Sequence, residues 1–331
     1  MSEVVLHYTR AGKVESLHRA DIAFVNLKGE LVDAVGDAKR PMFWRSAAKP
    51  FQVLPFVRDG GVEHFGLTQE ELAFLVSSHS GEKEHVALAQ SVLAKVGLTP
   101  DALACGAAKP MSGKAATAVL LAGEKFQAVH NACSGKHSGM LALAMLRGLS
   151  IDGYTLAEHA VQQVMHKEVA AAVGLRQDEV ELGIDGCGVP VFWLPLDRMA
   201  YGYARLAKPE GAGWGSDEES ITAVRNAMVA YPHAVAGTGR IDTVLMELTK
   251  GRLVAKIGSE AVYCLADTQS GLGMTFKVED GSYRSINPMV IGVLKRAGLL
   301  TKEEEAALWA KYPPVLKNHR GDIIGTIEVL F

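Results

Sequence analysis

The two ends of the chain have the pattern of β-strands, and the residues between them have the pattern of helices. Near the N-terminus, apolar runs at residues 22–27 and 31–35 flank Lys28-Gly29, a spacing typical of a hairpin. Toward the C-terminus, residues 253–257, 261–266 and 273–278 predict a meander, and residues 323–331 a last strand. A single sheet therefore has to draw its strands from both ends of the chain.

Between these ends, apolar residues recur at helical spacing. The segments with this spacing are 71–76, 83–96, 114–121, 140–146 and 156–173. We predict an α+β fold, with an antiparallel sheet built from the N- and C-terminal segments and a helical subdomain inserted between them. The expected boundaries make one domain of residues 1–331, with a sheet subdomain of about 1–45 and 235–331 and a helix-rich subdomain of about 46–234.

The composition argues against several classes of function. Lys and Arg total 34 against 37 Asp and Glu, so the chain lacks the excess of basic charge typical of nucleic-acid binding. The N-terminus shows no basic segment followed by an apolar one, and no stretch reaches the ~20 apolar residues of a membrane-spanning helix. We expect a cytoplasmic protein that binds neither nucleic acid nor membrane, in which the four cysteines stay reduced.

The segment Arg45-Ser46-Ala47-Ala48-Lys49-Pro50 contains a Ser-x-x-Lys pair. Residues three apart share one face of a helix, so the hydroxyl and the amine are expected to meet. Pro50 keeps a regular helix from beginning much before Ser46, which places the hydroxyl at a helix start, where backbone N–H groups favour an oxyanion. A desolvated lysine can activate such a serine as nucleophile. The alternative is a helix cap followed by a solvated lysine.

Two cysteine-containing segments are rich in polar side chains. Residues 131–139 read NACSGKHSG, and residues 185–190 read DGCGVP. Cys133, His137 and Cys187 are candidate ligands of a zinc ion, with water as the fourth, because thiolates and imidazoles are common zinc ligands. Burial of the cysteines without a metal is the alternative, and we favour it for the two remaining cysteines.

Three further polar segments are candidates for the same site. The segment Ser78 to Glu82 either caps the next helix or supplies a second hydroxyl to the Ser-Lys pair. Arg240 ends a Gly-Thr-Gly-Arg turn and is a candidate to bind a substrate carboxylate, although a plain glycine turn is the simpler interpretation. Lys256 lies near a strand end, where a lysine is normally solvated, and it gains interest only if it faces Ser46.

Together these segments resemble one family, the class 3 or rhizobial-type L-asparaginases. The matching pieces cover most of the chain and come in the family's order: Arg45-Ser-Ala-Ala-Lys-Pro, Ser78-His-Ser-Gly-Glu, Cys133-Ser-Gly-Lys-His-Ser-Gly-Met, Asp185-Gly-Cys-Gly-Val-Pro, Gly237-Thr-Gly-Arg and Lys256-Ile-Gly-Ser-Glu. Each motif is weak alone, but the ordered set is specific. The resemblance implies a fold like that of serine β-lactamases and serine-dependent glutaminases, a homodimer, and hydrolysis of L-asparagine to L-aspartate and ammonia.

The resemblance also implies a catalytic set. It makes Ser46 the nucleophile and Lys49 its base, with Ser78 and Lys256 as a second hydroxyl–amine pair beside them. The substrate is then a small amino acid.

For the metal, the resemblance and the chemistry of the residues disagree. Family members bind zinc through two cysteines and a lysine, positions that fall on Cys133, Lys136 and Cys187. Chemistry alone favours His137 over Lys136, because a lysine has to lose its proton before it binds a metal. We follow the family for the metal and keep His137 as a substrate-pocket residue, with Asp185 holding the metal-bound water or orienting the ligands. Since Ser-Lys chemistry does not need zinc, the ion is expected mainly to shape the substrate site.

Two arginines and one aspartate complete the expected substrate site. Arg45 or Arg240, together with the zinc site, is expected to fix the α-carboxylate and α-amine of the substrate. Some family members carry a cysteine where an approximate alignment puts Asp242. A carboxylate at that position changes the local charge, and with it the expected affinity for substrate.

Three other functions fit parts of the same pattern. A metal-dependent amidase would use zinc-activated water with Ser46 as a bystander, so that chelation abolishes turnover. A non-catalytic amino-acid sensor would bind asparagine and release no ammonia. A β-lactam-hydrolysing enzyme is disfavoured, because its substrates lie outside the cell and the chain shows no secretion signal.

Overall fold

The computed structural model describes all of residues 1–331. The chain packs as two compact units. Unit 1 comprises Met1–Met42, Pro195–Lys208 and Ala255–Phe331, and unit 2 comprises Phe43–Leu194 and Pro209–Val254. The subdomain boundaries expected from the sequence near residues 46 and 234 stay a prediction.

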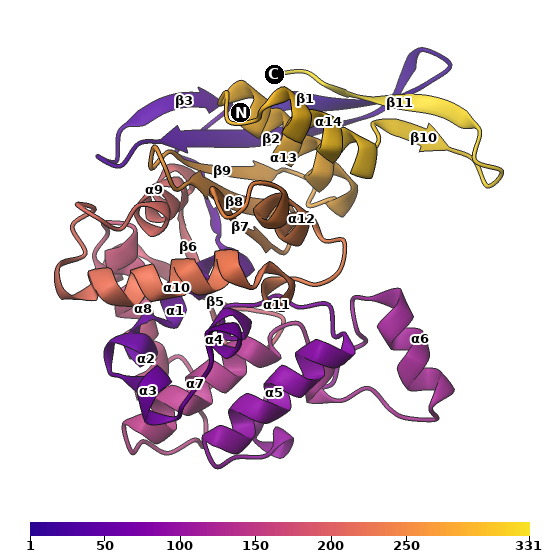
Figure 1. Ribbon diagram of the computed structural model, residues 1–331. Coiled ribbons are helices and arrows are strands. Elements are labelled where there is room, and N and C mark those ends of the chain that lie inside the picture. The colour runs from indigo at the N-terminus through magenta and orange to yellow at the C-terminus, as the bar shows by residue number, and fades with distance from the viewer. The chain divides into compact units, whose positions relative to one another are not determined.

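Unit 1 is built on an antiparallel sheet whose strands come from both ends of the chain (Figure 1). The strands are β1 (Glu3–Arg10), β2 (Lys13–Val25), β3 (Leu31–Val35), β7 (Leu253–Gly258), β8 (Val262–Asp267), β9 (Gly273–Val278), β10 (Val315–Lys317) and β11 (Ile323–Val329). They run in the order β10-β11-β1-β2-β9-β8-β7, with β3 paired to β2. The predicted α+β class is thereby confirmed, as are the N-terminal hairpin, the meander and the last strand.

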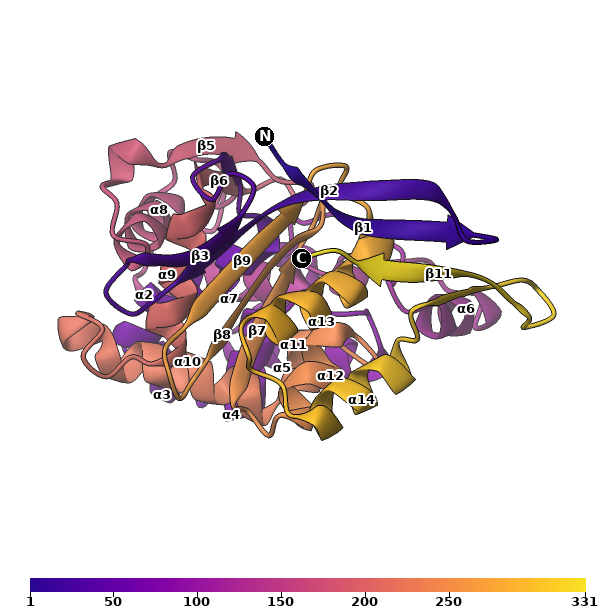
Figure 2. The same ribbon diagram turned by 90° about the horizontal axis from the view of Figure 1, so that it is seen from above.

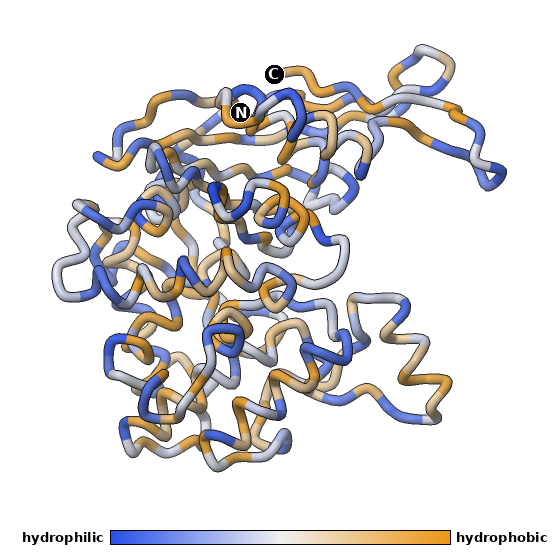
Figure 3. The backbone as a smooth tube through the Cα atoms, viewed as in Figure 1, coloured by the Kyte–Doolittle hydropathy of each residue, from blue (hydrophilic) through white to orange (hydrophobic).

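The register of the sheet joins the two ends of the chain directly. His7 of β1 lies opposite Glu328 of β11, and Ile22 of β2 lies opposite Phe276 of β9. Every residue of β8 is buried, which explains its continuous apolar run. By contrast, the turn between β10 and β11 is hydrophilic (Figure 3).

Three helices cover this sheet: α9 (Leu196–Ala207), α13 (Ile286–Arg296) and α14 (Lys302–Lys311) (Figure 2). Helix α9 packs on β2, β8 and β9, and α13 packs on β11. The approach of α9 depends on Gly273, because a Cβ there would lie 2.0 Å from the carbonyl oxygen of Ala200. A side chain at that position would push the helix off the strand.

Unit 2 is mainly helical. Its helices are α1 (Lys49–Gln52), α2 (Leu54–Arg58), α3 (Gly61–His64), α4 (Gln69–Leu75), α5 (Lys83–Lys95), α6 (Gly113–Leu121), α7 (Ser134–Leu146), α8 (Ala160–Ala172), α10 (Glu218–Ala230), α11 (Pro232–Val235) and α12 (Ile241–Leu248). A small sheet in the order β4-β6-β5 accompanies them, formed by β4 (Pro41–Phe43), β5 (Glu181–Ile184) and β6 (Pro190–Pro195). None of the helices is both long and apolar enough to cross a membrane.

Helix α7 is the centre of unit 2. Its residues from Ser134 through Ala144 are all buried, and α2, α4 and α5 pack against it. A Cβ on Gly135 would lie 2.1 Å from the carbonyl oxygen of Phe74, so only glycine lets α7 approach α4 this closely. The polar sequence that opens α7 is therefore held rigidly inside the unit, where the sequence predicted a helix only from residue 140.

Candidate active site

The Ser-x-x-Lys segment forms a tight turn and then a short helix. Arg45–Ala48 is a 3-10 turn, and α1 begins at Lys49. Arg45 has a φ of 54°, a left-handed conformation that costs a non-glycine residue about 1 kcal/mol or more. Its guanidinium is held by Asp185, with Nη2 2.9 Å from Oδ1. Such strain recurs at functional sites, where surrounding contacts maintain it.

Lys49 points toward a different serine from the one the spacing predicted. Its amine donates to the carbonyl oxygen of Ser77 at 2.6 Å and to the Ser78 hydroxyl at 3.1 Å. The side chains of Ser46 and Lys49 make no hydrogen bond with one another, although both are buried. The Lys49 amine is therefore held by Ser77 and Ser78, which are distant in the sequence, and not by Ser46 in the same turn.

The same amine also meets a thiol. Nζ of Lys49 lies 3.4 Å from Sγ of Cys133 and 3.5 Å from the carbonyl oxygen of Ala132. Burial lowers the pKa of Lys49; the Cys133 thiol opposes this shift, and the charge of Lys136 adds to it. An amine with a lowered pKa gives up its proton more readily, which a general base requires.

Two thiols, a lysine and an aspartate gather beside Lys49. Nζ of Lys136 lies 3.1 Å from Sγ of Cys187 and 3.5 Å from Oδ2 of Asp185. The donor atoms of Cys133, Asp185 and Cys187 all lie within 4.8 Å of one another. Three separate segments of unit 2 therefore bring their polar side chains to one point.

The charges in this cluster stabilise one another. A hydrogen bond from the Cys187 thiol holds the pKa of Cys133 well below its ordinary value, and it raises the pKa of Cys187. Burial acts to raise the pKa of Asp185, but the charges of Lys136 and Arg45 outweigh it and lower that pKa to about 2. Burial acts to lower the pKa of Lys136, but the two thiols and Asp185 together raise it above its ordinary value. The cluster therefore favours the deprotonated forms of Cys133 and Asp185 and the protonated form of Lys136.

This donor set fits a zinc ion. Two thiol sulfurs and a carboxylate oxygen within one small volume are ligands that zinc accepts, and the soft sulfurs disfavour magnesium and calcium. Lys136 contacts Cys187, whereas His137 turns away and bonds Tyr154, so the lysine is the nitrogen nearest the sulfurs. Binding through Lys136 requires that the amine lose its proton.

Sequence reasoning missed two partners of the opening turn of α7, the side chains of His79 and Tyr154. His79 bonds Ser134 with Nε2 2.8 Å from the hydroxyl oxygen, and His137 bonds Tyr154 with Nδ1 2.7 Å from the phenolic oxygen. Ser134 opens α7 directly after Cys133. The only sequence signal for His79 is its place beside Ser78 in a polar segment.

Three predicted site residues lie on elements other than those that carry the cluster. Arg240 is half-buried, and its guanidinium lies 3.6 Å from the sulfur of Met111. Asp242 is buried in the first turn of α12. Lys256 belongs to unit 1, where it is buried on β7 and donates to the carbonyl oxygen of Ile257 at 3.0 Å. Their roles in the site stay predictions.

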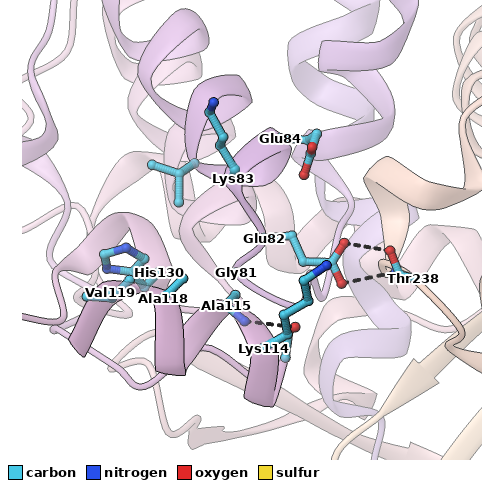
Figure 4. A pocket seen from close by; sticks show the side chains of 12 residues that line it. Gly81, Glu82, Lys83, Glu84, Lys114, Ala115, Ala118, Val119, His130 and Thr238 are labelled. Carbon is cyan, nitrogen blue, oxygen red and sulfur yellow. Dashed lines mark hydrogen bonds between the residues drawn. The ribbon is translucent and has the colours of Figure 1, made fainter. Parts of the chain in front are cut away.

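A large cavity of unit 2 borders the loop that follows Ser78. It has a volume of about 630 Å³, and its lining includes Gly81, Glu82 and Lys114. Figure 4 shows Glu82 bonded to Thr238 at this cavity. The cavity that borders Lys49 and Lys136 measures only about 10 Å³, which is too small for an amino acid. A substrate has to approach from the partly exposed side of the cluster, where Arg45, Cys133 and Asp185 lie.

Comparisons with known proteins complete this description. No curated protein matches the chain. Among solved structures, a protein described as a β-lactamase from Bacteroides dorei is 13% identical, with 83% of this chain and 93% of that chain covered and a TM-score of 0.42. A β-lactamase from Mycobacterium bovis is 14% identical, with 88% and 94% covered and a TM-score of 0.39.

Comparison with protein families gives a match along nearly the whole length. Residues 6–329 match the family described as L-asparaginase II. The match spans the Ser-Lys segment, both cysteine segments and the strands at either end of the chain. It confirms the resemblance that the ordered motifs indicated. The protein therefore belongs to the L-asparaginase II family, and it is an enzyme, an asparaginase.

Proposed function

We propose that the protein hydrolyses the side-chain amide of L-asparagine to L-aspartate and ammonia, through an acyl-enzyme on Ser46 with Lys49 as base. The observation that carries the proposal is the buried amine of Lys49. Lys49 follows Ser46 by three residues, and its amine bonds the Ser78 hydroxyl. A buried amine with a lowered pKa is the kind of base that a serine nucleophile needs.

In the first step, the proton of Ser46 passes to neutral Lys49 while the hydroxyl oxygen attacks the amide carbon. Two hydrogens of the neutral amine bond the carbonyl oxygens of Ser77 and Ala132, which leaves its lone pair for a hydroxyl proton. Ser78, at 3.1 Å, then acts as the relay between Ser46 and Lys49. Backbone N–H groups of the turn stabilise the oxyanion.

Ammonia leaves with a proton returned from Lys49, and the side chain remains as an ester on Ser46. Water then attacks the ester and gives a proton to Lys49, and Lys49 returns this proton to the Ser46 oxygen as L-aspartate leaves. The resemblance adds Lys256 as the amine partner of Ser78 in this proton transfer.

The substrate's α-groups are bound by charged side chains beside the cluster. We assign this role to Arg45 and Asp185, with His137, Arg240 and Asp242 as further candidates from the sequence. Cys133, Lys136 and Cys187 would hold a zinc ion, which supplies a Lewis acid for the α-amine or α-carboxylate when bound. The steps on Ser46 and Lys49 do not depend on it.

The resemblance further supports a homodimer and a cytoplasmic location. Light scattering coupled to size-exclusion chromatography measures the mass in solution, and a mass of one chain of 35.4 kDa would contradict the dimer.

A variant of this mechanism has Ser78 as the nucleophile. The hydrogen bond between Lys49 and Ser78 favours it, because this is the hydroxyl that touches the base. The metal-dependent amidase and the amino-acid sensor remain as outcomes of the same test.

The test is to trap the acyl-enzyme and locate it. The enzyme is quenched with acid during turnover of L-asparagine, digested with trypsin and measured by mass spectrometry. Trypsin cuts after Arg45, Arg58 and Lys83, so Ser46 and Ser78 fall in different peptides. An aspartyl mass on residues 46–58 supports Ser46, and the same mass on residues 59–83 supports Ser78. Ammonia release without an adduct supports the metal-dependent amidase, and no ammonia at all supports the sensor.

A further inference from the structure

Ser78 lies in the loop of residues 76–82 that joins α4 to α5. The backbone of this loop is tied to neighbouring segments. The Ser78 N–H donates to the carbonyl oxygen of Val235 at 2.9 Å, and the Ser80 hydroxyl donates to that of Ala236 at 2.8 Å. These bonds fix one edge of the loop.

His79 fixes the other edge, and its protonation state follows from its partners. The N–H of Gly81 donates to Nδ1 of His79 at 3.0 Å, so Nδ1 carries no proton. Nε2 therefore carries the proton and donates to the Ser134 hydroxyl oxygen at 2.8 Å. That hydroxyl donates onward to the carbonyl oxygen of Val129 at 3.3 Å. Every bond has one donor and one acceptor only when the imidazole is neutral.

The ring is also held in place by its faces. Its centroid lies 5.2 Å from that of Phe74 and 5.1 Å from that of His85, with the His85 ring stacked at 19°. The side chain is fully buried. His79 therefore has one available orientation, with Nε2 directed at Ser134.

The two segments that this bond joins both carry partners of Lys49. Ser78 precedes His79, and its hydroxyl lies 3.1 Å from Nζ of Lys49. Cys133 precedes Ser134, and its sulfur lies 3.4 Å from the same nitrogen. The bond between Nε2 of His79 and the Ser134 hydroxyl therefore links the residue after Ser78 to the residue after Cys133. This link sets the separation of the Ser78 hydroxyl and the Cys133 thiol around the Lys49 amine.

We propose that His79 is a positioning residue: through its bond to Ser134 it holds the Ser78 hydroxyl against the Lys49 amine. The inference rests on the proposed function insofar as it concerns catalysis. A misplacement of about 1 Å in such a contact can cost about 100-fold in rate.

Two substitutions separate the two bonds of the ring. In His79→Asn the amide oxygen can still accept from Gly81, but the side chain is too short to reach Ser134. In His79→Gln the amide nitrogen reaches Ser134 as Nε2 does. We expect His79→Asn to lower kcat for asparagine by about 100-fold with little change in KM, and His79→Gln to retain most of the activity. Ser134→Ala should reproduce the loss, and the double variant His79→Asn, Ser134→Ala should lose no more.

His166→Gln is the matched control, because His166 is a buried histidine of the same unit that bonds the carbonyl oxygen of Val180. It should keep its activity. Equal losses in His79→Asn and His79→Gln, or losses that follow the folded fraction measured by circular dichroism, would show a merely structural histidine and overturn the proposal. Additive losses in the double variant would overturn it too.

A crystal structure of His79→Asn provides a readout independent of substrate. The Lys49 to Ser78 separation, 3.1 Å here, should exceed the hydrogen-bonding limit of about 3.5 Å in that variant. An unchanged separation contradicts the positioning role. If the unaltered enzyme releases no ammonia from asparagine, the proposed function fails, whereas the measured separation still decides the role of His79.

Discussion

Two carboxylates of unit 2, the buried Glu71 and the half-buried Asp185, each meet a lysine, but their surroundings differ. Glu71 lies in α4, and its carboxylate accepts three hydrogen bonds. The donors are the Lys95 amine at 2.6 Å, the Ser91 hydroxyl at 2.7 Å and the Thr68 N–H at 2.7 Å. Each of these donors approaches the carboxylate from a different direction, and the Thr68 bond belongs to a capping box at the helix start. The network is complete without any further group.

Asp185 stands in a cluster whose members compete for the same partners. Lys136 lies between Asp185 and the Cys187 thiol, and Arg45 reaches Asp185 from a strained backbone conformation. A hydrogen bond from the Cys187 thiol, together with the charges of Lys49 and Lys136, lowers the pKa of Cys133. Such an arrangement costs free energy to assemble, and it contains two thiols of a kind that the Glu71 network lacks. The difference separates a carboxylate that stabilises the fold from one that belongs to a site.

The largest expected effect comes from the lysine of the site. Lys49→Met removes the proposed base, and we expect kcat/KM for asparagine to fall by about 10³-fold, since general base catalysis contributes up to that order. The free energy of unfolding should change little, because the desolvation cost of the buried amine disappears together with its hydrogen bonds. Ammonia release and chemical denaturation measure the two quantities. Activity within tenfold of the unaltered enzyme would contradict the role of Lys49.

Replacing the lysine of the Glu71 network by methionine should instead lower the free energy of unfolding and leave asparagine turnover unchanged. Lys95→Met leaves the buried carboxylate without its ion partner, so we expect a loss of about 3 kcal/mol in the free energy of unfolding. Asparagine turnover per folded molecule should stay unchanged. If Lys95→Met lowers kcat as Lys49→Met does, the two networks do not divide into structural and functional ones.

The pH dependence of stability sharpens the contrast further. Burial acts to raise the pKa of Glu71, but the bonds from Lys95, Ser91 and Thr68 outweigh it and bring the pKa below its ordinary value of 4.5. As the pH falls, the unfolded chain therefore takes up this proton first. The stability contributed by Glu71 is full above pH 4.5 and is lost as the pH falls through the lower, folded-state pKa.

Glu71→Gln should remove this contribution. We expect it to cost about 2 kcal/mol at pH 7, the net value of hydrogen bonds to a charged group, and progressively less as the pH falls below 4.5. Urea denaturation of both proteins across this range measures the difference. A difference that does not depend on pH would mean that the charge of Glu71 contributes nothing.

The two networks also differ in how many of their contacts could be predicted from the sequence. The Glu71 network follows from local rules, since Thr68 and Glu71 form a capping box three residues apart. In the site, the spacing of Ser46 and Lys49 predicted a contact that tertiary packing replaced with one to Ser78. The deciding partners come from segments 28 or more residues away, and no periodicity encodes such a meeting.

The fold shows the same division between local and distant information. Apolar alternation and helical spacing predicted the strands of the meander and five helices of unit 2, α4 to α8. The early start of α7 at Ser134 escaped the pattern, because its first turn is polar and becomes buried only through its contact with α4. For the metal ligands, the family resemblance named Lys136 where chemistry alone named His137. The structure puts the lysine next to the sulfur because His137 is engaged by Tyr154.

The smallest expected effect is that of removing a metal, and it tests whether the Asp185 cluster is a substrate site or a catalytic one. Dialysis against a chelator should raise the KM for asparagine by roughly tenfold and leave kcat nearly unchanged, since a group that binds ground and transition states equally affects KM alone. Added zinc should restore the KM. The Cys133→Ser variant provides the control, because it should show the raised KM without a chelator and respond to neither treatment. Complete loss of kcat on chelation would instead make metal-activated water the nucleophile, and Ser46 a bystander. The Glu71 network has no thiol among its partners, so the stability lost in Lys95→Met should be the same with and without the chelator.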